Sequence, residues 1–278
     1  MDNTKVLKAL SALQPSSDTM RTFLTTPVPR DWGTVQCVLR RTVSGRAQSY
    51  QVFLDTKQPA GKLEQQRFLM YAKKMPDNKT ANYHITCEDG NPSKDCAMYL
   101  GKLRSNFLGT EFTIYDDGIN PKHARNPFKA RDKSVRKELG AVVYQQNVLG
   151  SKGPRNMRAG MPQLDADGGI PVFRETKHDN IVEKFKRDPG DEGLYELINK
   201  PPRWDERIGE HVLNFKGRVT CASVKNFQFV RKGDLEHVLL QFGKIGKHEF
   251  TMDFAHPFTP LQAFAMSLSS IDSKKACE

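Results

Sequence analysis

The sequence has few cysteines and no pattern that would pair them. Its five cysteines are scattered and odd in number, and none belongs to a C-x-x-C pair. This excludes a disulfide scaffold and a zinc module, and it favours a reducing compartment. The first residues lack the basic start and apolar stretch of a signal peptide, and no apolar run elsewhere is long enough to span a membrane. We therefore expect an intracellular protein whose contact with any membrane is peripheral.

Catalytic and cofactor-binding signatures are missing as well. The seven histidines are dispersed, and neither H-E-x-x-H nor G-x-S-x-G occurs. Residues 150–155 lack the spacing of a phosphate loop, and residues 165–168 open like a calcium loop without its remaining ligands. Asp116 and Asp117 are adjacent in a predicted turn, so their side chains would not converge on one substrate. We expect a protein that is not an enzyme and that holds neither a metal ion nor a cofactor.

Basic residues exceed acidic ones over the whole chain. Lys and Arg total 43, whereas Asp and Glu total 32, which gives a formal net charge of +11. An excess of this size favours a polyanionic partner, either nucleic acid or the anionic face of a membrane. A basic protein with no such partner is the plain alternative that composition leaves open.

Charge is absent from one stretch near the end of the chain. No Asp, Glu, Lys or Arg occurs between Asp253 and Asp272, and residues 259–271 have the pattern of a helix that is apolar all round. Thr259 is a good N-cap, and Gln262 completes a capping box with it. With about eleven residues the helix would be roughly 16 Å long, too short for a hydrocarbon core about 30 Å thick. We therefore expect protein to surround it on all sides.

The segments before this helix predict what surrounds it. Residues 33–254 contain many short runs with period-two alternation, separated by Gly, Pro, Asn and Asp, which is typical of a sandwich or a barrel. A sandwich core about 10 Å thick cannot surround a helix about 10 Å across. An eight-stranded barrel is filled by its own side chains. We therefore predict a mostly β fold: a closed, largely antiparallel barrel of about twelve strands around a central hydrophobic C-terminal helix.

We divide the chain into two parts. Residues 1–31 are expected to be an N-terminal tail and linker, with a short amphipathic helix near its start as the alternative. Residues 32–278 are expected to form the barrel domain. Within it, the basic segment 121–137 reads as an insertion, and residues 134–139 at its end are expected to form a helical turn.

The sharpest basic pattern is G-K-L-R-S-N at residues 101–106. On a strand, Lys102 and Arg104 project from the same face about 6.7 Å apart, because alternate residues share a face. Two neighbouring cations repel one another unless an anion lies between them. The planar fork of an Arg and the compact charge of a Lys together can bind two neighbouring phosphates. An ordinary solvated strand face would give the same pattern. Lys216 and Arg218 repeat the spacing, either to extend a basic patch or to keep a strand face solvated.

Several stretches resemble the tubby C-terminal domain, and the resemblance covers the chain from about residue 33 to the end. The matching stretches are G-T-V-Q-C (33–37), G-K-L-R-S-N (101–106), N-V-L-G-S-K-G-P-R (147–155), L-N-F-K-G-R-V-T (213–220), A-S-V-K-N-F-Q (222–228), F-T-M-D (250–253) and L-S-S-I-D-S-K-K-A-C-E (268–278). The resemblance implies a closed barrel of about twelve strands threaded by a hydrophobic C-terminal helix. It also implies phosphoinositide binding, with phosphatidylinositol 4,5-bisphosphate as the usual ligand.

The resemblance assigns this ligand to four residues. Lys102 and Arg104 match the Lys and Arg that grip the ring phosphates in the family. Asn82, in Ala-Asn-Tyr, matches an Asn that lies beside them, and Arg136, which precedes K-E-L-G-A-V, matches an Arg that completes the site. His84 and the long loop at residues 121–133 depart from the usual pattern, and no F-box precedes the domain.

The function expected is that of a peripheral membrane adapter. The family includes adapters that carry receptors into cilia, so a protein cargo or a transport complex is expected to bind the N-terminal segment. We expect a monomer in the cytoplasm, at the plasma membrane or the cilium, with the nucleus as a further location. The alternative is a nucleic-acid-binding transcriptional regulator that uses the same basic surface. It ranks second, because few aromatic residues accompany the basic ones and no major-groove helix motif is present.

Overall fold

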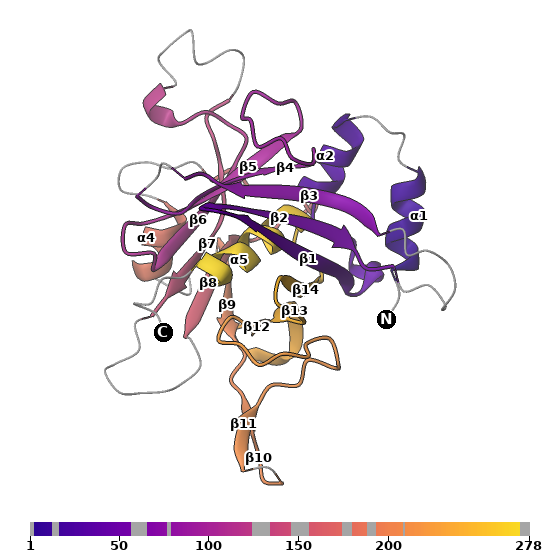
Figure 1. Cartoon of the computed structure of the whole chain (residues 1–278). Coiled ribbons are helices and arrows are strands. Elements are labelled where there is room, and N and C mark those ends of the chain that lie inside the picture. Colours follow the sequence, from indigo (N-terminus) through magenta and orange to yellow (C-terminus); the bar gives the residue numbers. More distant parts are fainter. Residues whose placement is uncertain are drawn as a thin grey trace.

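Twelve antiparallel strands close into a barrel in the computed structural model, which describes residues 3–12, 17–56, 66–76, 79–123, 134–145, 156–173, 180–187, 193–207 and 209–272 (Figure 1). The barrel strands are β1 (Val35–Ser44), β2 (Ala47–Leu54), β3 (Arg67–Lys74), β4 (Asn82–Thr86), β5 (Tyr99–Ser105), β6 (Glu111–Asp116), β7 (Glu138–Tyr144), β8 (Met157–Pro162), β9 (Leu194–Asn199), β12 (Phe227–Arg231), β13 (Asp234–Lys244) and β14 (Glu249–Phe254). Around the ring they follow the order β1, β14, β13, β12, β9, β8, β7, β6, β5, β4, β3, β2. The closed, twelve-stranded antiparallel barrel predicted from the sequence is confirmed.

Helix α5 (Pro260–Asp272) contacts strands on opposite sides of this ring. Every residue from Pro260 to Ile271 is buried. The helix contacts β14 and also β5, β6 and β7; between β14 and β6 lie five strands in either direction around the ring. At its start, the Thr259 N–H donates to Gln262 Oε1 at 2.9 Å, and the Gln262 N–H donates to Thr259 Oγ1 at 3.0 Å. These reciprocal bonds are the predicted capping box.

The N-terminal segment is not the loosely ordered tail expected first, and the short helix near its start that was the alternative is present. It contains α1 (Thr4–Ala12), α2 (Ser17–Thr25) and the short 3-10 helix η1 (Arg30–Trp32), which lie against one end of the barrel (Figure 1). Leu10 of α1 and Leu24 of α2 are fully buried in the main hydrophobic core, and α2 contacts α5. Packing of such apolar side chains stabilises short helices whose own propensity is weak, and here it outweighs the Ser- and Thr-rich composition.

A hairpin and a further helix also lie outside the barrel wall. Strands β10 (Arg203–Asp205) and β11 (Glu210–Val212) form a separate hairpin that projects from the barrel (Figure 1). Helix α4 (Ile181–Arg187) packs on β7 and β8, and its first N–H, that of Ile181, donates to the buried Glu138 carboxylate at 2.7 Å. None of the described helices is long and apolar enough to cross a bilayer.

A buried ion cluster lies at the seam where β1 joins β2 and β14. The Arg218 guanidinium donates twice to Asp253 of β14, at 2.7 and 2.8 Å, and once to Asp55, just after β2, at 2.5 Å. It also lies 3.4 Å from the carbonyl oxygen of Cys37 in β1. Only 11% of the Arg218 side chain is exposed. Arg218 therefore neither extends a basic patch nor keeps a strand face solvated, contrary to both alternatives considered above, whereas Lys216 is exposed.

Candidate anion-binding site

The register of β4, β5 and β6 brings the basic side chains of the G-K-L-R-S-N motif together with polar partners on one outer face. Two adjacent cross-strand rows form this face: Asn82, Arg104 and Thr113 in one, and His84, Lys102 and Tyr115 in the other. Tyr83 and Leu103, which alternate with these residues, are fully buried in the core. The alternation therefore points Lys102 and Arg104 to the same outer face, as a strand requires.

Arg136 reaches this face from the segment just before β7. Its backbone N–H donates to the carbonyl oxygen of Ile119 at 2.9 Å. Its guanidinium carbon lies 3.9 Å from the centre of the Tyr115 ring, and Lys102 Nζ lies 5.5 Å from the same centre. The negative face of an aromatic ring attracts such cations. The helical turn expected at residues 134–139 is wrong, because this segment pairs with residue 119 and then enters β7.

Two glycines make the close approaches in this region possible. A Cβ atom at Gly101 would lie 2.2 Å from the carbonyl oxygen of Tyr115, and one at Gly118 would lie 2.4 Å from the Cα of Arg136. Neither distance leaves room for a side-chain carbon, so both positions need glycine. The basic motif begins with Gly101 because β5 approaches β6 closely at that position. Gly118 allows the backbone of Arg136 to lie close to the end of β6.

The cations of this face are unusually well buried. Lys102 is 7% exposed and Arg136 is 4% exposed, whereas Arg104 is half-buried. Arg104 makes no ion pair with any residue in the described ranges. Removing a cation from water costs free energy unless a counter-charge compensates it. A bound anion would supply such compensation for Arg104.

Lys94 is a further cation that sequence reasoning missed. It lies in the connection between β4 and β5, and its pKa is lowered, first by burial and then by the positive charges of Arg104 and Arg136. Lys94 is exposed, and the two arginines whose charges act on it belong to this face. The only signal in the sequence is a lysine shortly before the G-K-L-R-S-N motif, and the path of the connecting loop had to be known to place it.

His84 occupies the centre of this positive region. Its Nδ1 lies 3.0 Å from the carbonyl oxygen of Pro92, so Nδ1 carries a proton and donates it. Its Nε2 is buried and makes no hydrogen bond with any described residue, as is also true of Asn82 Oδ1. Burial, followed by the charges of Lys94 and Lys102, lowers the pKa of His84 to about 4. The imidazole is therefore neutral at physiological pH in the unliganded protein.

A hollow of about 950 Å³ adjoins these residues, within the usual size of a small-molecule site. Its basic lining consists of Arg104, Lys122 and Arg136, and Tyr115 also lines it. Three acidic residues, Glu111, Glu138 and Glu183, complete its charged lining among the described residues.

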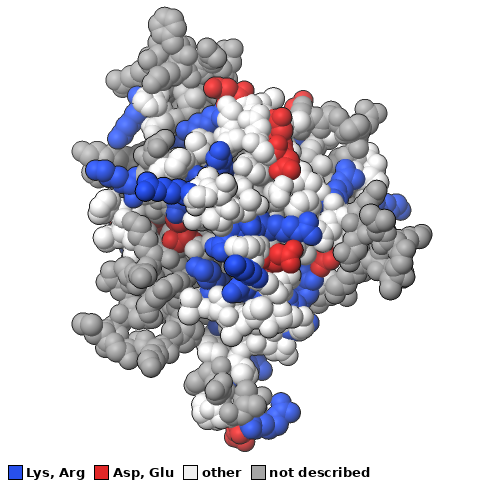
Figure 2. Space-filling view, in the orientation of Figure 1, with Lys and Arg blue, Asp and Glu red and all other residues white. Residues whose placement is uncertain are grey.

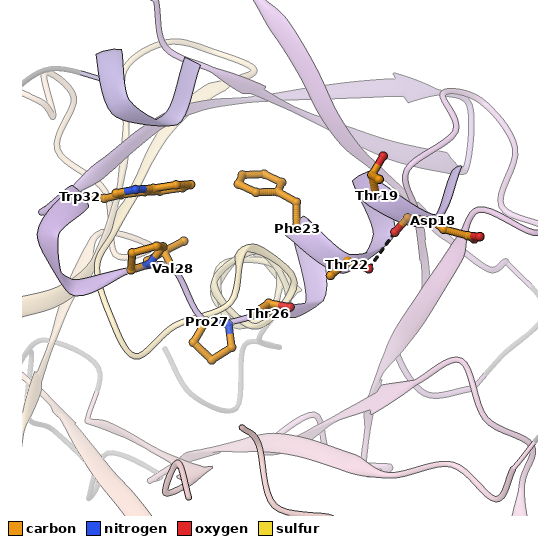
Figure 3. Close-up of a pocket in the computed structure, with 9 residues that line it drawn as sticks. Asp18, Thr19, Thr22, Phe23, Thr26, Pro27, Val28 and Trp32 are labelled. Atoms are coloured by element: carbon orange, nitrogen blue, oxygen red, sulfur yellow. Dashed lines mark hydrogen bonds between the residues drawn. The ribbon is translucent and has the colours of Figure 1, made fainter. Parts of the chain in front are cut away.

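A second hollow, of about 410 Å³, lies beside α2 and has a different chemistry. Figure 3 shows the rings of Phe23 and Trp32 near one another, with Val28 and Pro27 along the same wall. Among the described residues that line it, Asp18 is the one charged side chain, and its sign is wrong for an anion. This hollow is therefore not the anion site. Within the described residues, no group of three His, Cys, Asp or Glu side chains is placed to hold a metal ion.

The structure thus brings all four sequence-predicted residues, Asn82, Lys102, Arg104 and Arg136, to one face. Residues 150–155, which resembled a phosphate loop only faintly, lie outside the described residues. On the face shown in Figure 2, basic side chains are more widespread than acidic ones, although the two are mixed.

Comparisons with known proteins agree with the fold. The model of the Tub family matches residues 24–273. Human Tubby-related protein 1 is 41% identical over 266 residues, which cover 94% of this chain and 47% of that protein. Human Tubby-related protein 3 is 40% identical over 266 residues, which cover 94% of this chain and 58% of that protein. Tubby protein homolog 1 of Caenorhabditis elegans is 42% identical over 221 residues, which cover 77% of this chain and 50% of that protein. The chain therefore spans about half the length of these relatives.

Proposed function

The chain belongs to the Tub family, and from this premise we propose that its basic outer face binds phosphoinositide headgroups, with phosphatidylinositol 4,5-bisphosphate as the usual ligand. In this proposal Lys102, Arg104 and Arg136 contact the ring phosphates, and Asn82 contributes its side-chain amide. The amide group can turn so that its NH₂ faces the anion, because the two ends of an Asn side chain are interchangeable in shape. The observation that carries the proposal is the gathering of largely buried cations around Tyr115.

The expected affinity requires directed contacts. Diffuse attraction to an anionic leaflet contributes about 1 kcal/mol per surface cation, so these three cations would contribute about 3 kcal/mol, which is weaker than millimolar binding. Micromolar binding needs about 8 kcal/mol. Hydrogen bonds to charged groups contribute roughly 1.5–3 kcal/mol each, and the fixed positions of Lys102 and Arg136 against the Tyr115 ring favour such bonds.

We propose that the protein binds rather than transforms its ligand, as a peripheral adapter that links a membrane to a protein cargo or transport complex. A cytoplasmic location at the plasma membrane or cilium follows from this role, with the nucleus as a further location. The N-terminal helices, the expected contact for such a partner, bury Val6 and Leu10 against the barrel. A partner would therefore contact the other, more exposed side of α1.

The first prediction tests the anion site with vesicles that contain each phosphoinositide isomer. Lys102→Ala/Arg104→Ala should lower affinity for the bisphosphate lipid by at least about 100-fold, since two charge-assisted hydrogen bonds are lost. Lys216→Ala/Lys247→Ala removes two exposed lysines and is the matched control, because it lowers net charge equally. If both double variants bind alike, the site is misplaced.

Competition between short DNA and soluble inositol trisphosphate distinguishes the lipid-binding function from the alternative, a nucleic-acid-binding regulator. A nucleic-acid binder should lose affinity for DNA steeply as salt rises and should release the inositol phosphate when DNA is added. The proposed lipid receptor should retain the inositol phosphate under the same conditions. Displacement by DNA at comparable concentration would favour the transcriptional alternative.

A further inference from the structure

The turn between β5 and β6 presents two apolar side chains to solvent. Phe107 is 67% exposed and Leu108 is 56% exposed, and Phe107 is the most exposed large apolar side chain in the described parts of the chain. Single exposed apolar residues are common, but adjacent ones at a protruding position indicate a contact surface.

This turn is held in shape by its own hydrogen bonds. Asn106 Oδ1 accepts the N–H groups of Thr110 at 3.0 Å and Glu111 at 3.3 Å, and Asn106 Nδ2 donates to Thr110 Oγ1 at 3.0 Å. The Asn106 N–H donates to the Glu111 carbonyl oxygen at 2.9 Å, and Gly109 adopts a positive φ of 73°, which favours glycine. Since these bonds fix the backbone of the turn, they also fix the positions from which Phe107 and Leu108 expose their side chains to solvent.

The turn begins at the rim of the anion site. Ser105 and Asn106, directly before Phe107, line the same hollow as Arg104 and Arg136. Lys122 on the same rim is exposed. An apolar tip beside a cluster of cations matches the layered chemistry of an anionic membrane surface, in which phosphates lie directly above hydrocarbon.

We propose that Phe107 and Leu108 insert into the acyl region of the bilayer while the neighbouring cations hold the lipid phosphates. This inference rests on the proposed phosphoinositide function and adds a second, apolar contact to it. The bilayer is the occupant that the surroundings favour, because the tip is continuous with the phosphate-binding face and positive side chains lie beside it. Interfacial insertion of this kind buries apolar groups about 5–10 Å into the headgroup boundary, and aromatic residues are enriched at that depth.

The second prediction tests this inference with Phe107→Ser/Leu108→Ser. Binding to soluble inositol trisphosphate should be unchanged, whereas binding to vesicles containing the bisphosphate lipid should fall at least about 10-fold, since the transfer of apolar area into the membrane is lost. Val172→Ser/Val224→Ser removes two other exposed apolar side chains, 55% and 62% exposed, and should leave both affinities unchanged.

A direct readout comes from Phe107→Trp, measured against the wild type and its two native tryptophans. Its added fluorescence should shift to shorter wavelength on vesicles and be quenched by brominated acyl chains. Three results would overturn the inference: no quenching, equal vesicle binding by the serine variant, or an equal loss for the soluble headgroup, which would make the turn a support for the phosphate site. Failure of the wild type to bind either ligand would instead refute the proposed function.

Discussion

His84 shows how the anion site affects the rest of the molecule at the scale of one residue. Charged and titratable side chains face it from each neighbouring element: Lys73 is its register partner on β3, Lys94 approaches from the connecting loop, and Lys102, Arg104 and Tyr99 lie on β5. A proton on this imidazole would add a further positive charge to a buried cluster that already repels it. The folded protein therefore resists protonation of His84 more than the unfolded chain does.

The third prediction concerns acid stability. Because the pKa of His84 is lowered to about 4 in the folded protein and is about 6.5 in an unfolded chain, its protonation does not affect stability above pH 6.5. As pH falls from 6.5 towards 4, His84 is protonated in the unfolded chain but stays neutral in the folded protein, so the free energy of unfolding falls. Between pH 7 and pH 5 the loss should be about 2 kcal/mol, measured by urea unfolding.

A neutral replacement isolates this effect. His84→Gln should lose about 2 kcal/mol less between pH 7 and pH 5 than the wild type, whereas His123→Gln, at an exposed histidine, should behave like the wild type. Soluble inositol trisphosphate should reduce the loss in the wild type, since its negative charge offsets the neighbouring cations. An identical pH response of wild type and His84→Gln would contradict the assignment.

At the scale of an element, α5 is where the sequence was most informative. Thr259 and Gln262 are recognisable as a capping box because both residue types and their spacing are needed for the reciprocal bonds that the structure contains. The uncharged stretch that follows has no polar face, so it required a surrounding wall, and the number of short strands limited that wall to a large barrel.

The fourth prediction concerns the start of α5. Thr259→Ala should lower the free energy of unfolding by about 2 kcal/mol, since loss of an N-cap costs about 0.5–2 kcal/mol and the Gln262 N–H would be left without its acceptor at a buried position. Thr259 and Gln262 are 1% and 2% exposed, so water cannot replace the lost oxygen. Thr259→Ser keeps that oxygen and should unfold close to the wild type in chemical denaturation; equal losses in the two variants would point to the methyl group instead.

Other elements carry weaker local signals. Strand β8 contains Gly160, whose missing side chain leaves room for Phe185 of α4, so its pattern depends on a helix distant in sequence. Residues 134–139 include good helix formers, but the pairing of Ile119 with Val135 keeps their start extended. Helix α2 has the composition of a linker, and it is positioned by Leu24, which packs in the core. In each case tertiary packing outweighed local propensity.

At the scale of the whole molecule, the barrel depends on how its first and last strands meet. Arg218 lies outside the strands and contacts carboxylates from both sides of β1. The sequence did not predict this role, because the spacing of Lys216 and Arg218 is also that of a solvated strand face. The gathering of Asn82, Lys102, Arg104 and Arg136 followed from the family resemblance, and their ligand stays a prediction.

The fifth prediction concerns this seam. Arg218→Ala should lower the free energy of unfolding by roughly 3–5 kcal/mol, because it leaves the buried Asp253 carboxylate and the half-buried Asp55 carboxylate without their cation. Arg203→Ala is the matched control: it breaks an ion pair with Glu236 whose side chains are 71% and 69% exposed, and such a pair contributes about 0–1 kcal/mol. Chemical denaturation compares the two variants, and similar small losses would show that the seam does not depend on Arg218.

The position of α5 in the chain has a consequence for synthesis. Every strand of the barrel precedes residue 260, and domains emerge from the ribosome in order, at about 5–20 residues per second. The whole wall is therefore translated before α5, and the apolar sides of the nascent strands that α5 contacts stay uncovered until that helix has been synthesised. A chain that stops just before residue 260 would therefore contain all twelve barrel strands but lack the buried helix that contacts β5, β6, β7 and β14.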